Sequence, residues 1–250
     1  MKKLKLLLIA IIVVTINSCD DDDPIATSGN ILFDFTHNWD GDNVTADDFN
    51  IIQFTTADGD AMSVSKLRYL ISNITLHKTD GSAIPIDGYI LIDLSTQSTS
   101  AFVSNIPFDT YTSISFTFGF DEADNIDGFY NDLNAVSWNW PEMLGSGYHF
   151  MQLEGKYLDA AVESPFAYHM GTARLSPGVF EANHFEVFIN GFTSTSDASI
   201  EIKMNISEWF KNPYTWDLET YNIDLMMNYD AQILMNQNGG SVFSLGNVNQ

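Results

Sequence analysis

Apolar and polar residues alternate along several stretches of this sequence, and this period of two constrains the fold more than any other feature. The most regular stretch runs from Ala198 to Ile206, where every second residue is apolar. Other stretches of this kind, or with similar strand-like composition, are Ile31–His37, Leu67–His77, Tyr89–Leu94, Ile114–Phe120, Tyr148–Gly155 and Phe185–Gly191. Alternation is typical of half-buried strands, and Asp-Gly turns separate several of these stretches. The sequence therefore predicts a mostly β fold, an antiparallel two-sheet β-sandwich.

One short helix is predicted near the C-terminus, at residues 217–237. Asp217 is its expected N-cap, and Asn238-Gly239-Gly240 is its expected end. The apolar stripe of this helix would consist of Ile223, Met226, Met227, Ala231 and Leu234. No repeat or linker divides the chain, so residues 30–250 are expected to form a single domain.

The N-terminal segment has the pattern of a secretory signal. Lys2, Lys3 and Lys5 precede an apolar run, Leu6–Val14, that is too short to span a bilayer as a helix. The run ends in Ile16-Asn17-Ser18-Cys19, which resembles the cleavage site of a lipoprotein. Residues 1–18 are therefore interpreted as a signal peptide and Cys19, the only cysteine, as the lipidated first residue of the mature protein.

An acidic tether follows the lipidation site, and we assign residues 19–29 to it. Asp20–Asp23 resembles the acidic stretch of lipoproteins that Bacteroidota export to their surface. The sequence thus predicts an outer membrane lipoprotein, attached through Cys19 and either surface-exposed or facing the periplasm.

The charge of the chain excludes one class of partner. Three of the ten basic residues lie in the signal segment and all 33 acidic residues lie outside it, so the mature formal charge is 7 − 33 = −26. Such a chain lacks the basic face that neutralises phosphates, so nucleic acid is not an expected partner. A hydrophobic content of 45% suffices for one large core.

Catalytic motifs are missing from the sequence. It contains no glycine-rich phosphate loop, no H-E-x-x-H zinc motif and no G-x-S-x-G nucleophile elbow. No nucleophile and base can be paired, so we expect a binding protein rather than an enzyme.

The histidines are the best candidates for metal ligands. His37 lies on the apolar face of its strand pattern, and a core role is the simpler interpretation for it and for His149. His169 is followed by Met170, and imidazole and thioether groups suit Cu(I) in a chain without a usable thiolate.

Two tryptophans form the densest aromatic segment, Trp138-Asn139-Trp140, which is followed by Gly147–Phe150. A buried aromatic core is one interpretation. An intact indole offers only an N–H donor and cannot bind a metal through a lone pair. A tryptophan whose ring had been opened by oxidation would expose an amine and a carbonyl, and could take part in a metal site.

The order of these motifs resembles the MbnP-like copper-binding domain family, which includes methanobactin-associated proteins and surface proteins of methanotrophs. The resemblance covers most of residues 30–245. It rests on an ordered set of segments: His37, Leu67–Leu76, Trp138–Trp140, Gly147–Phe150, Glu154-Gly155 and His169–Gly171.

The resemblance implies a β-rich fold and a mononuclear copper site made of two histidines and a kynurenine derived from tryptophan. Carried over to this chain, it gives His169 and His37 as ligands, with His149 in reserve. Trp138 or Trp140 would be the kynurenine precursor. A di-haem peroxidase-like protein is the implied partner in the oxidation.

Two further interpretations remain open at this point. Asp121, Asp124 and Asp127 offer hard oxygen ligands in a loop that ends at Gly128, which makes calcium a candidate cofactor beside copper. In place of copper binding, the protein would be a metal-free surface module that binds a glycan or a protein partner through exposed aromatic residues.

Overall fold

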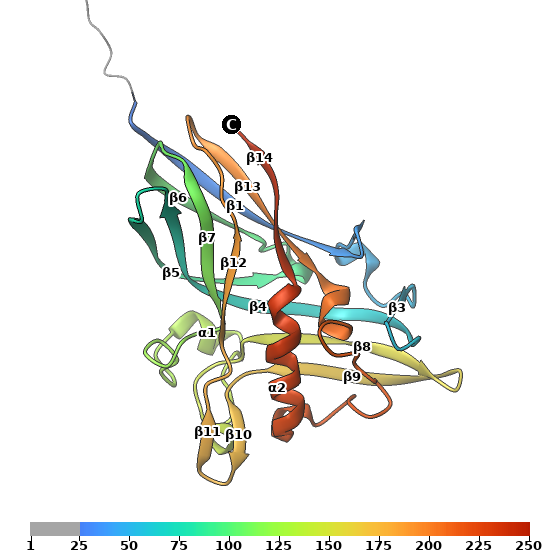
Figure 1. Ribbon diagram of the computed structural model, residues 1–250. Helices are drawn as coiled ribbons and strands as arrows, with labels where there is room; N and C mark the ends of the chain where they lie inside the picture. The colour runs from blue at the N-terminus through green and yellow to red at the C-terminus, as the bar shows by residue number, and fades with distance from the viewer. Residues whose placement is uncertain (1–25) are drawn as a thin grey trace, which may run out of the picture.

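The structure is a computed structural model that describes residues 26–250. It contains a five-stranded sheet, a seven-stranded sheet and a two-stranded hairpin, with only two short α-helices (Figure 1). The predicted β-rich sandwich with a short C-terminal helix is therefore confirmed. The predicted signal peptide, Cys19 and the tether up to residue 25 lie outside the described residues.

The five-stranded sheet is built around the first strand of the domain. Its strands are β1 (Ser28–Trp39), β2 (Asp42–Asn43), β6 (Ser100–Pro107), β13 (Ala198–Asn205) and β14 (Phe243–Asn249). They follow the order β14-β13-β1-β2, with β6 also paired to β1. The pair β1–β13 is parallel and the other pairs are antiparallel. The alternation predicted for both strands is confirmed, because every second residue is buried from Ile31 onward in β1 and from Ala198 onward in β13.

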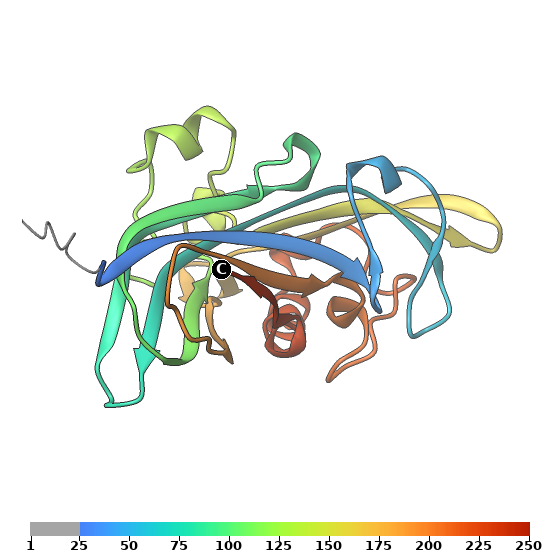
Figure 2. The ribbon, with the colours of Figure 1, turned by 90° about the horizontal axis from the view of Figure 1, so that it is seen from above.

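The seven-stranded sheet is organised around one long strand, β4 (Ala61–Lys78). The other strands are β3 (Phe54–Thr55), β5 (Ala83–Asp93), β7 (Tyr111–Phe118), β8 (Met151–Asp159), β9 (Val162–Met170) and β12 (Phe185–Asn190). The order is β12-β7-β4-β8-β9, and β3 and β5 also pair with β4. The long β8–β9 hairpin projects from one end of the molecule, past the end of β1 (Figure 2).

The main core lies between the two sheets. Phe33 and Phe35 of β1 are buried there with Tyr69 of β4 and with Phe116 and Phe118 of β7. A second, smaller cluster consists of Leu70, Phe120, Leu133, Trp138 and Tyr148. Four of these five residues come from the β7–β8 connection, residues 119–150, so this loop covers the sheet with a hydrophobic layer of its own.

Short helices and a hairpin complete the structure. The α-helices are α1 (Asn131–Ala135) and α2 (Tyr229–Asn238), and the hairpin joins β10 (Ala173–Ser176) to β11 (Val179–Glu181). The 3₁₀ turns are η1 (Ala46–Asp48), η2 (Leu94–Thr96), η3 (Glu142–Leu144), η4 (Ile206–Phe210), η5 (Leu225–Met227) and η6 (Gly239–Ser241).

The predicted start of the C-terminal helix at Asp217 is wrong. The Asp217 side chain accepts hydrogen bonds from the backbone N–H groups of Glu219 and Thr220, which closes a turn rather than starting a helix. The helix begins after Asn228, whose side chain accepts from Ala231 N–H, and it ends at Asn238 as predicted. The residues Ile223, Met226 and Met227 therefore lie in a loop and in η5, outside the helix.

Candidate metal centre

The tryptophan segment and the His149 segment are paired with each other locally. His149 N–H donates to Trp138 O at 2.9 Å, and Trp140 N–H donates to Gly147 O at 2.8 Å. Asn139 and Tyr148 form an antiparallel bridge between these contacts. This small ladder places both tryptophans beside His149.

His149 is enclosed by the two indole rings. Its ring centroid lies 5.5 Å from that of Trp138 and 4.9 Å from that of Trp140. The exposed fractions are 0% for Trp138, 2% for Trp140 and 6% for His149. Gly171 permits this packing, because a Cβ at residue 171 would lie 2.5 Å from the Trp140 ring.

A second imidazole, that of His169, faces His149. The two ring centroids are 5.4 Å apart and the rings are nearly perpendicular. A metal–nitrogen bond of about 2.0 Å places each imidazole centroid about 3 Å from the metal, so two rings on one metal ion have centroids at most about 6 Å apart. The observed separation is compatible with both rings binding one ion.

The hydrogen bonds of the two rings determine which nitrogens are free. His149 Nδ1 lies 3.1 Å from the carbonyl oxygen of Trp138, and His169 Nε2 lies 2.9 Å from Glu154 Oε1. A carbonyl or an ionised carboxylate only accepts hydrogen bonds, so both of these nitrogens carry the proton. In the neutral form of each ring, the lone pair is on Nε2 of His149 and on Nδ1 of His169. Orienting contacts of this kind accompany most histidine ligands.

Glu154 is held in the ionised form by its neighbours. Its hydrogen bond with His169, and then the contact with Lys66 Nζ at 2.7 Å, lower the pKa of the Glu154 carboxyl to about 2. For His149, burial is the largest effect and lowers the pKa of the imidazole to about 4. The His149 ring is therefore neutral, and able to act as a ligand, throughout the neutral and mildly acidic range.

The two tryptophans differ in their polar contacts. Trp140 Nε1 donates to Leu144 O at 3.1 Å, whereas the buried Nε1 of Trp138 has no hydrogen-bond partner. The guanidinium of Arg68 lies 4.9 Å above the Trp138 ring, and Arg68 Nε is 3.1 Å from Asp93 Oδ2. Trp138 thus combines an unsatisfied buried donor with a cation over its ring, whereas the indole N–H of Trp140 is hydrogen-bonded.

His37 is not brought together with these residues. Its ring is buried in the main core, where Nε2 lies 3.1 Å from Tyr69 Oη. Tyr69 is paired with Met151, which is paired with Met170. His169 is the neighbour of Met170 in β9, and adjacent strand residues point to opposite faces of a sheet. His37 and His169 therefore lie on opposite sides of the seven-stranded sheet.

The acidic loop predicted to bind calcium uses one of its carboxylates to stabilise a turn. Asp121 Oδ1 accepts from the backbone N–H groups of Ala123 and Asp124, and Asp121 Oδ2 accepts from the Asn73 amide. In residues 26–250, no three His, Cys, Asp or Glu side chains gather closely enough to hold a metal ion. Calcium binding by Asp121, Asp124 and Asp127 stays a prediction.

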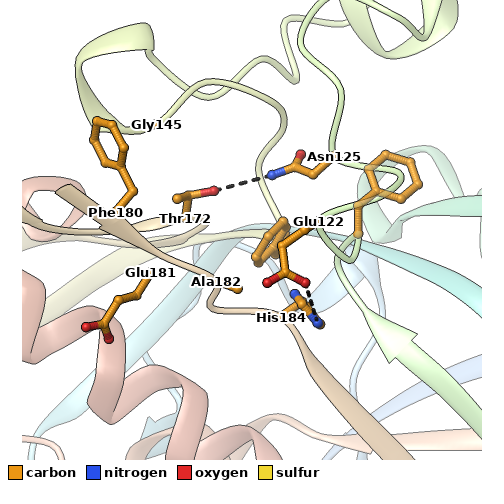
Figure 3. A pocket seen from close by; sticks show the side chains of 10 residues that line it. Glu122, Asn125, Gly145, Thr172, Phe180, Glu181, Ala182 and His184 are labelled. Atoms are coloured by element: carbon orange, nitrogen blue, oxygen red, sulfur yellow. Dashed lines mark hydrogen bonds and ion pairs between the residues drawn. The ribbon is translucent and has the colours of Figure 1, made fainter. Parts of the chain in front are cut away.

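A pocket of about 280 Å³ lies beside this loop, and four of its polar side chains form two pairs (Figure 3). Asn125 Nδ2 donates to Thr172 Oγ1 at 3.3 Å, and His184 Nε2 lies 4.0 Å from Glu122 Oε2. The two contacts link the β7–β8 loop to the segment that carries β10 and β11.

Several residues of the centre were not identified as functional from the sequence. Lys66, Arg68 and Glu154 surround the site on the face that also carries His169. Gln232 of α2 fixes the backbone there: its Nε2 donates to His169 O at 2.8 Å and its Oε1 accepts from Gly171 N–H at 3.2 Å. The one signal in the sequence that bears on Lys66, Arg68 and Glu154 is the alternation of side chains along β4 and β8, which places Lys66 and Arg68 on one face of β4.

None of the helices in the described part of the chain is long and apolar enough to cross a membrane.

Comparisons with known proteins place the chain in a family. A search of curated proteins gives no match. Among solved structures, the chain is similar to MbnP from Methylosinus trichosporium, with 13% sequence identity and a TM-score of 0.55 over 88% of this chain and 99% of that one. A sequence model of the family described as MbnP matches residues 28–228. Because this match spans most of the chain, the protein belongs to the MbnP family.

Proposed function

We propose that this protein binds copper as a cargo between His149 and His169, for acquisition or delivery at the cell envelope. The observation that supports the proposal is the pair of imidazoles with centroids 5.4 Å apart. One nitrogen of each ring, Nδ1 of His149 and Nε2 of His169, is hydrogen-bonded to an acceptor. Two imidazole ligands without a carboxylate form a donor set that suits copper better than calcium or magnesium.

The surroundings of the pair also favour copper over the alternative functions. A glycan-binding module needs exposed aromatic platforms, and Trp138 and Trp140 are instead buried against His149. The described residues supply no nucleophile held by a base at this centre, so the protein is proposed to bind and release the ion rather than to catalyse a reaction.

Trp138 is the proposed site of oxidation to kynurenine, in preference to Trp140. Its indole N–H lacks a partner, whereas opening of the ring would create an amine and a carbonyl beside His149. The conversion replaces one carbon by one oxygen and adds about 4 Da, which the intact mass of the native protein measures. A di-haem peroxidase-like partner is proposed for this step on the basis of the family resemblance. A mass that matches unmodified tryptophan would remove kynurenine from the proposal.

Attachment to the outer membrane through lipid on Cys19 completes the proposed function. It rests on the signal-like segment that ends at Cys19. Metabolic labelling with a radioactive fatty acid tests it, with Cys19→Ser as the matched variant. Equal labelling of both proteins would contradict lipidation at Cys19.

Copper titration of the full chain, in competition with a chelator, tests the binding site. His149→Ala and His169→Ala are each expected to lose at least tenfold in affinity. His184→Ala serves as the control, since it removes a histidine outside the centre. His37→Ala is expected to retain wild-type affinity, provided that it folds. Copper binding that is unchanged in His149→Ala and His169→Ala would refute the proposed site.

A further inference from the structure

A second pocket opens beside His169, and its surface is rich in methionine. It has a volume of about 360 Å³ and is mainly apolar. His169 and Ala167 of β9 form one side. The remaining lining residues belong to or adjoin η3 and η5, and they include Met143, Met226 and Met227.

The distribution of methionine in the molecule distinguishes these three residues. The chain has eight methionines after residue 25. Five of them are fully buried and act as core residues: Met62, Met151, Met170, Met204 and Met235. The remaining three are Met143, Met226 and Met227, and all of them line the pocket beside His169. Met143 and Met227 are 60% and 54% exposed, so packing of a core does not explain why methionine is used there.

Both methionine-bearing turns are fixed to the histidine centre by hydrogen bonds. Leu144, next to Met143, accepts through its carbonyl from Trp140 Nε1 at 3.1 Å. On the other side, the buried amide of Gln232 donates both to Leu225 O, next to Met226, at 3.1 Å and to His169 O at 2.8 Å. The turns are thus held in position relative to His169 rather than placed beside it by chance.

Thioethers have a specific preference among metal ions. They are soft, uncharged ligands that suit Cu(I) and bind hard cations weakly. They do not titrate, and so protons do not compete for them as they do for imidazole. Asp224 is the only acidic residue that lines this pocket, and its apolar surroundings favour a monovalent ion over a divalent one.

We propose that Met143, Met226 and Met227 form a site for cuprous ion beside His169, through which copper reaches and leaves the His149–His169 pair. This inference rests on the proposed copper-binding function. It adds a second position for the ion, and it assigns the oxidation state that the protein takes up and releases. The transfer is an exchange of ligands and involves no change of oxidation state.

Silver(I) is the probe for this site, because it is a soft monovalent ion that does not change oxidation state. The full chain, labelled with ¹³C at the methionine methyl groups, is titrated with Ag(I) and followed by NMR. The methyl signals of Met143, Met226 and Met227 are expected to shift, whereas those of the buried Met62 and Met204 stay in place. Single Met→Leu variants assign the signals. Unchanged signals for all three methionines of the pocket would overturn the proposal.

The stoichiometry supplies a second and independent test. The triple variant Met143→Leu, Met226→Leu, Met227→Leu keeps the side-chain volume and removes only the sulfurs. It is expected to bind one equivalent of Ag(I) fewer than wild type, with Cu(II) affinity within twofold of wild type. Ile223→Leu alters the same pocket without removing sulfur and is expected to behave as wild type. A triple variant that retains full Ag(I) stoichiometry would contradict the site.

The two proposals fail in different ways. If copper binding survives in His149→Ala and His169→Ala while Ag(I) shifts the three methyl groups, the histidine centre is refuted and the methionine site stands. If those histidine variants lose copper while the methyl groups do not respond to Ag(I), only the methionine site is refuted.

Discussion

Lowering the pH from 7 to 5 is expected to destabilise the metal-free protein through His37. Burial lowers the pKa of this imidazole to about 4, from an ordinary value of 6.5. In the unfolded chain the group takes up a proton as the pH falls below 6.5, whereas in the folded protein it stays neutral until about pH 4. The unfolded state therefore binds more protons between these values, and the stability of the protein falls as the pH falls.

The size of the effect follows from the two pKa values. One pKa unit corresponds to about 1.4 kcal/mol, and at pH 5 the contribution of His37 amounts to a loss of about 2 kcal/mol relative to pH 7. His149 adds a loss of similar size, because burial likewise lowers its pKa to about 4. Glu154 adds only about 0.2 kcal/mol to the loss at pH 5, because its pKa of about 2 in the folded protein and its ordinary value of 4.5 both lie below this window.

Urea unfolding at pH 7 and at pH 5 measures this loss, with His37→Gln compared with wild type. A glutamine at residue 37 does not titrate, so the loss between the two pH values is expected to be about 2 kcal/mol smaller in the variant. This corresponds to about 1 M in the urea midpoint if m is about 2 kcal/mol per M. His184→Gln is the control, since the side chain of His184 is 24% exposed whereas His37 is buried. An equal loss in wild type and in His37→Gln would refute the assignment of a neutral, buried imidazole to His37.

Three further results are expected. Glu154→Gln removes the charge that orients His169, and copper affinity is expected to fall by about 10- to 100-fold in a chelator competition while the thermal midpoint changes little. Gly171→Ala is expected to cost about 1–3 kcal/mol in chemical unfolding, because its Cβ would meet the Trp140 ring, whereas Gly240→Ala meets nothing within 4 Å and should be near neutral. Arg68→Gln removes the cation above Trp138 and is expected to change the tryptophan fluorescence; an identical spectrum would contradict the cation–π contact.

The strands could be predicted from the sequence because alternation is a local property. From Ile31 in β1 and from Ala198 in β13, every second residue is buried, as the pattern indicates. Their parallel pairing could not be predicted in the same way. The register joins Ile31 to Ala198 across most of the chain, and an alternating pattern is the same for parallel and antiparallel neighbours.

The start of the C-terminal helix is set by a capping hydrogen bond of Asn228 rather than by the spacing of apolar residues. Ile223, Met226 and Met227 fit a helical stripe with Ala231 and Leu234, but the residues before Asn228 form turns instead. Asp217 and Asn228 are both good capping residues, and the sequence did not distinguish between them. The error concealed the position of Met226 and Met227, which line the pocket beside His169.

The histidine pair was only partly predictable for a related reason. His169 was the favoured ligand, and it does lie in the centre. Its predicted partner His37 lies on the other side of the seven-stranded sheet. His149, predicted as a reserve ligand, faces His169 with 5.4 Å between the ring centroids. Alternation along a strand shows which residues share a face of that strand. It does not show which residues of two strands far apart in the sequence lie on the same face of the folded sheet. The position of His149 depends on its pairing with the Trp138 segment, which is a loop contact.

The location of the centre determines which variants will be informative. Stability comes mainly from the core between the sheets, whereas the centre lies on the other face of β8 and β9 beneath the 119–150 loop. Replacing His149 or His169 therefore removes a ligand without opening the main core. Trp138 is different, because it is fully buried within the five-residue cluster that holds this loop. Trp138→Ala would create a cavity and cost about 3–5 kcal/mol, so a loss of copper binding in that variant would report on folding as much as on the metal. Trp138→Phe keeps most of the packing and prevents kynurenine formation, and copper binding by Trp138→Phe at wild-type affinity would show that the two histidines suffice.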